Sequence, residues 1–112
     1  MSDRDKIVLE KILKYIHSVL SYVEGMDYDA FIQDEMRVSA TAFMLGQIGE
    51  VAKEVSETLR NANPDIPWIA MRNMRNRIVH NYENVDLKIL WATATNDLPQ
   101  LSLKIESLLQ CA

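Results

Sequence analysis

Apolar residues recur at intervals of three and four positions along most of the chain, a spacing that places them on one face of an α-helix. The first stripe belongs to a helix expected to begin near Asp3 and to end around Gly25. Its members are Leu9, Ile12, Leu13, Ile16, Val19, Leu20 and Val23. Only three glycines and three prolines interrupt the chain, and no alternating pattern indicates a strand. The pattern predicts an almost wholly helical protein.

A short helical turn and a long second helix are expected next. Asp27 and Asp29 are suited to cap or turn residues for a short turn through Phe31, and Asp34 can then open a helix that runs to about Arg60. The apolar stripe of this second helix consists of Leu45, Ile48, Ala52, Val55 and Leu59.

Two glycines, Gly46 and Gly49, interrupt the second helix three residues apart. Each costs about 1 kcal/mol relative to alanine in a helix interior. We therefore expect a close crossing with another helix at this point, which would compensate for the cost.

A third helix is expected after the loop at residues 61–65, because a first helical turn tolerates a proline such as Pro67. This helix carries several arginines, and polar residues at Asn81, Glu83 and Asn84 weaken it near its end.

Asp86 is a suitable cap for a last helix, which Pro99 should kink or split near Thr95. Trp68 and Trp91 are interpreted as core anchors. The connections between the helices are short, which favours antiparallel neighbours. The sequence thus predicts an all-α bundle of four main helices plus short helical turns, forming a single domain over residues 1–112.

Composition restricts the function. The chain has 112 residues, 48% of them hydrophobic, and a net charge of -4, which argues against a protein that holds nucleic acid by a broad basic face. Any anion binding must be local. A lone cysteine, Cys111, excludes an internal disulfide and disfavours a cysteine-based metal site. No apolar run approaches the roughly 18 residues of a membrane span, so a soluble, cytoplasmic protein is expected.

One segment departs from this acidic background. No carboxylate occurs between Asp65 and Glu83, whereas three arginines and a histidine do: Arg72, Arg75, Arg77 and His80. Such a segment is suited to binding a phosphate group. Metal-free RNA cleavage needs a base, an acid and a cation that stabilises the charged phosphorane, and histidine and arginine can supply these. There is no rival phosphate loop, His/Cys metal cluster or serine with a spaced base. The alternative is a solvated basic helix face with an ordinary histidine.

The spacing of Arg75 and His80 poses a geometric problem. A separation of five residues corresponds to about 140° around an ideal helix, so the two side chains cannot easily contact the same phosphate from a regular helix. Either the helix loosens before His80, or the pocket combines residues from two chains of a two-fold dimer.

The order of Arg75, Asn76, His80 and Tyr82 resembles the signature of HEPN-domain proteins, specifically the HepT-like toxins of bacterial and archaeal HepT–MntA pairs. The similarity covers most of the chain. Matching segments are found at residues 48–53, 67–68, 85–86 with Trp91, and 98–99.

The resemblance implies an all-helical homodimer and a metal-independent ribonuclease without a cofactor. Arg75 and His80 of facing chains would be catalytic, and Asn76 would support them. Tyr82 would receive AMP from a nucleotidyltransferase antitoxin of the MntA kind, which would silence the toxin. The implied partners are therefore RNA, the antitoxin and a second copy of the chain.

Two positions depart from the family pattern. Asn73 stands where glycine is common, and Glu83, where an aromatic residue commonly follows the tyrosine, puts a negative charge beside the expected RNA cleft. Glu50 is a candidate partner for an arginine or a simple exposed acid. Two other functions therefore remain open: a non-catalytic module that binds a nucleotide or a partner protein, and a purely structural dimerising bundle.

Overall fold

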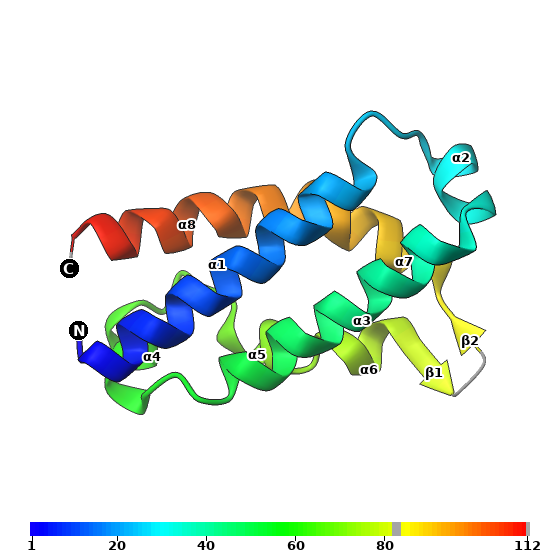
Figure 1. Cartoon of the computed structure of the whole chain (residues 1–112). Helices are drawn as coiled ribbons and strands as arrows, with labels where there is room; N and C mark the ends of the chain where they lie inside the picture. Colours follow the sequence, from blue (N-terminus) through cyan, green and yellow to red (C-terminus); the bar gives the residue numbers. More distant parts are fainter. Residues whose placement is uncertain (82–83, 112) are drawn as a thin grey trace.

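The computed structural model describes residues 1–81 and 84–111, with the backbone alone at 79–81 and 84. Its elements in chain order are α1 (Asp3–Val23), α2 (Tyr28–Gln33), α3 (Glu35–Ala52), α4 (Glu57–Ala62), α5 (Trp68–Arg72), α6 (Met74–Ile78), β1 (Val79–Asn81), β2 (Asn84–Val85), α7 (Leu87–Ala92), the π-helical turn η1 (Thr93–Asp97) and α8 (Leu98–Gln110). Figure 1 shows these elements along the chain.

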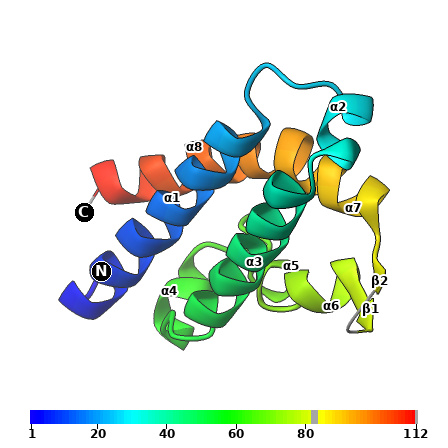
Figure 2. The ribbon, with the colours of Figure 1, turned by 45° about the vertical axis from the view of Figure 1, so that its right-hand side comes forward.

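Three long helices organise the molecule. α1 packs along α3 on one side and along α8 on the other, and α5 and α6 lie against α3 (Figures 1 and 2). Both termini lie at one end, and the short β1–β2 pair lies at the opposite end. The all-α fold is thus confirmed. No helix in the described part of the chain is long and apolar enough to cross a membrane.

The predicted apolar stripes face the core. Fully buried side chains include Leu9, Ile12, Ile16, Val19, Leu45, Ile48, Leu90, Leu98 and Ile105. The first helix has the expected bounds: the Ser2 hydroxyl accepts a hydrogen bond from the Asp5 amide at 3.0 Å, and Gly25 follows its end with φ of 74°. Asp27 caps α2, as predicted, by accepting a bond from the Ala30 amide at 2.8 Å.

The prediction of one long second helix to about Arg60 is wrong. α3 ends at Ala52, and α4 begins after Ser56, whose hydroxyl caps it by accepting a bond from the Leu59 amide at 3.2 Å. The Asp5 side chain, only 3% exposed, accepts bonds from the Ser56 hydroxyl and, at 2.9 Å, from the Ser56 amide. A buried carboxylate of α1 thus fixes the start of α4.

The contact between Asp5 and Ser56 predicts a pH-dependent stability. Burial by itself raises the pKa of the Asp5 carboxyl, but the bonds from Ser56 and Ser2 outweigh it, so this pKa lies below its ordinary value. A depressed folded-state pKa adds stability above the unfolded value of about 3.9, and this stability is lost as the pH falls through the folded pKa. Asp5→Asn should lower the free energy of unfolding by about 1–3 kcal/mol at pH 7 and by less near pH 2.

Thermal melts between pH 2 and 7 would measure this difference. Asp3→Asn is the matched control, because Asp3 is exposed in the same first turn. An equal and pH-independent effect of the two variants would contradict the assignment.

The third helix is split. Asn73 separates α5 from α6: its amide closes α5 on the Ile69 carbonyl at 3.1 Å, and its carbonyl accepts from the Arg77 amide at 3.2 Å. Pro67 stands just before α5 rather than inside its first turn. The chain then forms a short antiparallel pair, β1 and β2, which the apolar pattern did not predict.

The last helix follows the prediction. The Asp86 carboxylate caps α7 through the Ile89 amide at 3.0 Å. The helix then widens into the π-helical turn η1 and continues as α8, which has Pro99 in its first turn. Because proline lacks an amide hydrogen, the pattern of backbone hydrogen bonds along the helix must change there.

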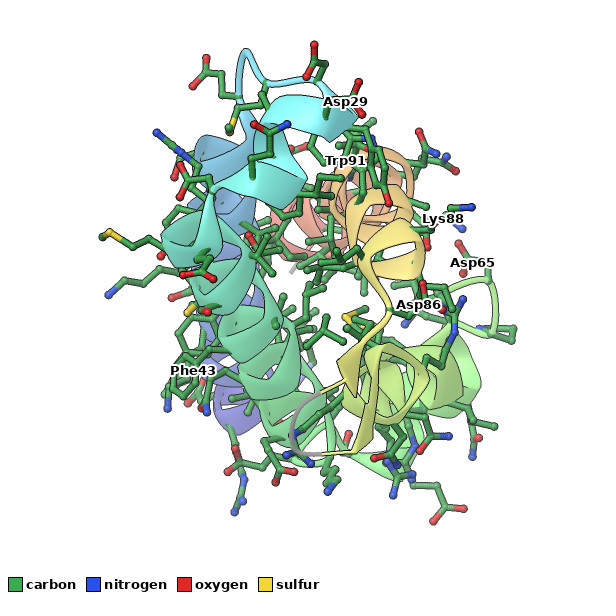
Figure 3. All side chains as sticks on the ribbon, turned by 90° about the vertical axis from the view of Figure 1, so that its right-hand side faces the viewer. Asp29, Phe43, Asp65, Asp86, Lys88 and Trp91 are labelled. Atoms are coloured by element: carbon green, nitrogen blue, oxygen red, sulfur yellow. The ribbon has the colours of Figure 1, made fainter. Side chains whose placement is uncertain are left out.

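The two tryptophans do anchor the core. Trp68 is buried, and its indole Nε1–H donates to the Asn63 carbonyl at 2.9 Å. Trp91 is half-buried on α7 beneath α2, with its ring centroid 5.1 Å from that of Phe31 and 6.2 Å from that of Tyr28 (Figure 3). The interpretation of both rings as packing groups is confirmed.

Candidate active site

Along α5 and α6, buried apolar side chains alternate with exposed arginines. Four apolar side chains of α5 and α6 are buried: Trp68, Met71, Met74 and Ile78. Arg72, Arg75 and Arg77 lie between them and are exposed, as is Asn76. The buried positions thus fix the backbone while the charged groups stay in water.

None of these three arginines forms an ion pair with a described residue. In an acidic chain, this leaves a local excess of positive charge on α5 and α6. Glu50 does not compensate for it, since its carboxylate accepts from Lys53 Nζ at 3.0 Å. Each of these arginines can therefore attract an anion without breaking a salt bridge to a described residue.

The segment packs closely against α3 at Gly46 and Gly49. A Cβ atom on Gly49 would lie 3.0 Å from the Met71 carbonyl oxygen and 3.3 Å from that of Arg72. A Cβ atom on Gly46 would lie 3.4 Å from Cδ of Arg75. The predicted close crossing is thus confirmed, and the alkyl part of Arg75 lies directly over Gly46.

The backbone at His80 is extended rather than helical, so the separation of about 140° on an ideal helix does not apply to it. α6 ends at Ile78, so His80 belongs to the extended segment β1. The Asp86 amide donates to the Ile78 carbonyl at 2.7 Å, which ties the end of α6 to the start of α7. Val79 pairs with Val85, and Asn81 pairs with Asn84. The chain therefore leaves the helix before His80, a loosening that is compatible with a site in one chain and with a cleft shared by two chains.

The predicted site residues are only partly covered by the structure. Arg75 and Asn76 are described with their side chains, and His80 only by its backbone. Tyr82 and Glu83 lie outside the described residues. Within the described residues, no group of three or more His, Cys, Asp or Glu side chains could hold a metal ion.

Sequence reasoning missed two features that position the site. The first is the contact between Gly46 and Arg75: the glycine spacing indicated a crossing but not its partner. The second is the β1–β2 pair, which is too short to give an alternating pattern.

Comparison with known proteins gives concordant matches. A family model described as Ribonuclease HepT-like matches residues 12–108. A Thermococcus cleftensis protein named "Probable ribonuclease HepT" is 32% identical over 108 residues, which are 96% of this chain and 98% of that protein. A Methanocaldococcus jannaschii protein with a provisional RNase name is 31% identical over 111 residues, covering 98% of this chain and 96% of the relative. No solved structure matches the chain significantly.

Proposed function

The chain belongs to the HepT-like ribonuclease family, and we propose that it is the toxin of a toxin–antitoxin pair, acting as a metal-independent RNA endonuclease. One observation carries the proposal: Arg75, exposed and free of ion pairs with described residues, stands one turn before a helix end that leads directly to His80. The names of the relatives support RNA as the substrate class.

The proposed reaction uses the 2′-hydroxyl of RNA as the nucleophile. Its oxygen attacks the adjacent phosphorus, and the bond to the 5′-oxygen breaks, giving a 2′,3′-cyclic phosphate and a 5′-hydroxyl. His80 exchanges the proton at the attacking or the leaving oxygen. Arg75 stabilises the additional negative charge of the phosphorane, and Asn76 supports the position of these groups.

The test is cleavage of a labelled RNA in the presence of EDTA. We expect Arg75→Ala to lower the cleavage rate by about 10²–10³-fold and His80→Ala by about 10²–10⁴-fold. Arg72→Ala is a matched control, since it removes an exposed arginine of the same segment. Intact RNA with the unaltered chain would favour the non-catalytic binding module, and a requirement for metal would contradict the mechanism.

We further propose that two copies form a two-fold dimer through α3. Large apolar side chains are exposed on its outer face, with Met36 at 83% and Phe43 at 65%. Together with Ala40 and Gln47 they follow a spacing of four, three and four residues, which is typical of a helix–helix seam. We call these four residues the α3 seam.

The α3 seam lies beside the candidate site. The Arg75 side chain packs against Gly46, which is about 60° around the helix from Phe43. A two-fold contact along the seam would therefore place the arginine of each copy at the edge of the interface. This supports a cleft to which both copies contribute.

Tyr82 is the proposed point of inactivation. Its hydroxyl would attack the α-phosphorus of ATP, bound by a nucleotidyltransferase antitoxin, and pyrophosphate would leave. The attached AMP would add bulk and a negative charge two residues from His80, and so repel RNA.

Incubation with a cognate nucleotidyltransferase and ATP is expected to add whole AMP residues to the chain, measured by intact mass spectrometry. Tyr82→Phe should prevent the addition, because it removes only the acceptor hydroxyl. Tyr28→Phe, on α2, is the control that should still be modified. Unchanged modification of the Tyr82 variant would refute the assignment.

A further inference from the structure

A groove lies between α5–α6 and the start of α8, on the side of α6 away from the candidate site. Its volume is about 280 Å³. Arg77 lines it, whereas Arg75 lies over Gly46. The two arginines are two residues apart, which is about 200° around a helix, so they lie on different faces of α6.

The floor of the groove is apolar and fixed. It consists of Met71, Met74, Leu98 and Leu101, none of which is more than 5% exposed. Methionine side chains adapt to apolar groups of different shapes. The accessible apolar lining is formed by Pro67, which is exposed, and Ala70, which is half-buried, so an aliphatic side chain can pack there without a change in the fold.

The rim of the groove carries two cations and one acid. Arg77 is exposed and forms no ion pair with a described residue. Lys104 Nζ donates to the Asp65 carbonyl at 2.9 Å, which uses one of its three donors and holds the ammonium group near the groove. Among the described lining residues, Asp97 is the single acid. The balance favours an anionic ligand, although the chain as a whole is acidic.

Size and chemistry select the kind of ligand. Small-molecule sites usually have about 300–1,000 Å³, so this open groove accommodates one or two side chains rather than a whole cofactor. Single-stranded RNA is usually held on aromatic platforms, and no aromatic side chain lines the described part of this groove. An apolar floor with a cationic rim instead matches a peptide that carries an apolar side chain beside a carboxylate.

We propose that this groove binds an acidic segment of a protein partner. An aliphatic side chain of the segment packs against Pro67 and Ala70, beside the buried Met74 and Leu101. A neighbouring carboxylate accepts hydrogen bonds from Arg77 and Lys104. The site is independent of RNA cleavage, since it uses neither Arg75 nor His80.

Fluorescence anisotropy with a short fluorescein-labelled peptide of repeating leucine and glutamate tests the proposal. We expect saturable binding to the full chain and a Kd about tenfold weaker for Arg77→Gln, the loss of one charge-assisted bond. Gln100→Glu, which adds a carboxylate to an exposed position of the lining, should weaken binding in the same direction. Both changes are at exposed positions, and thermal melts would verify that the fold is retained.

Two controls make the test specific. Arg72→Gln removes an exposed arginine that does not line the groove, and it should leave the Kd within about twofold. A peptide with glutamine in place of glutamate should bind at least about tenfold more weakly. Absence of binding, equal losses for Arg72→Gln and Arg77→Gln, equal binding of the glutamine peptide, or displacement of the acidic peptide by a short RNA would each overturn the proposal.

Discussion

A chain in which glutamate replaces Phe43 is expected to be monomeric and inactive on RNA, although Arg75 and His80 are unchanged. Phe43 is 65% exposed in the single chain, so its replacement should alter the free energy of unfolding by only about 0.5 kcal/mol. At a two-fold interface the same change removes an aromatic anchor and buries two like charges. An anchor of this kind contributes about 2 kcal/mol or more to association.

Analytical ultracentrifugation and cleavage assays on the same preparations would measure both effects. Leu103→Glu is the matched control, because Leu103 is 66% exposed on α8 and lies outside the α3 seam. We expect this control to remain dimeric and active. A Phe43→Glu chain that stays dimeric would reject the α3 seam as the interface, and an active monomer would reject the shared cleft.

Mixed dimers separate a shared cleft from two independent sites. If arginine and histidine come from different copies, a dimer of one Arg75→Ala chain and one His80→Ala chain retains one complete pair. Random mixing makes half of the dimers mixed, so about a quarter of the original activity should return. If each copy acts alone, mixed dimers would be as inactive as the two single variants.

Gly49→Ala is expected to destabilise the fold, and more than Gly46→Ala does. The new Cβ atom would lie 3.0 Å from the Met71 carbonyl oxygen, which belongs to the backbone and cannot rotate away. The helix α5 would have to move off α3, at a cost of about 1–3 kcal/mol. Alanine brings a gain of about 1 kcal/mol to a helix interior, which offsets only the lower end of this cost.

Urea denaturation would measure the loss, and Gly46→Ala is the internal comparison. Its Cβ atom would meet only the Arg75 side chain, at 3.4 Å, which can shift. We therefore expect Gly46→Ala to be close to neutral in stability. Equal destabilisation by the two alanines would contradict the proposed role of the Gly49 contact with α5.

The sequence predicted those parts of the fold that depend on local signals. The stripe of α1, the cap at Asp27 and the cap at Asp86 were all found where expected. The disturbance before Pro99 was also correct, because the missing amide hydrogen of proline acts within one helical turn.

The break after Ala52 could not be predicted in this way. The apolar stripe continues through Val55 and Leu59, both buried, so periodicity alone indicates an unbroken helix. The break is stabilised by Asp5, which lies 51 positions away from Ser56 in the sequence. Such a contact exists only after α1 and α4 have met.

In the candidate site, too, the sequence predicted the features with local signals and missed those set by tertiary contacts. The residue types and their order indicated phosphate chemistry, and the glycines indicated a close crossing. The contact between Arg75 and Gly46 is a tertiary contact, and the end of α6 at Ile78 is tied to the Asp86 amide. Neither leaves a periodic signal in the sequence.

The position of the chain ends has a practical consequence. The amino and carboxyl termini lie together at the end of the molecule opposite β1 and β2 (Figure 1). A carrier protein, a fluorescent label or a surface linker attached to either terminus would therefore leave the motif-bearing end unobstructed. The chain is thus suited to immobilised single-molecule assays in which RNA approaches from the free side.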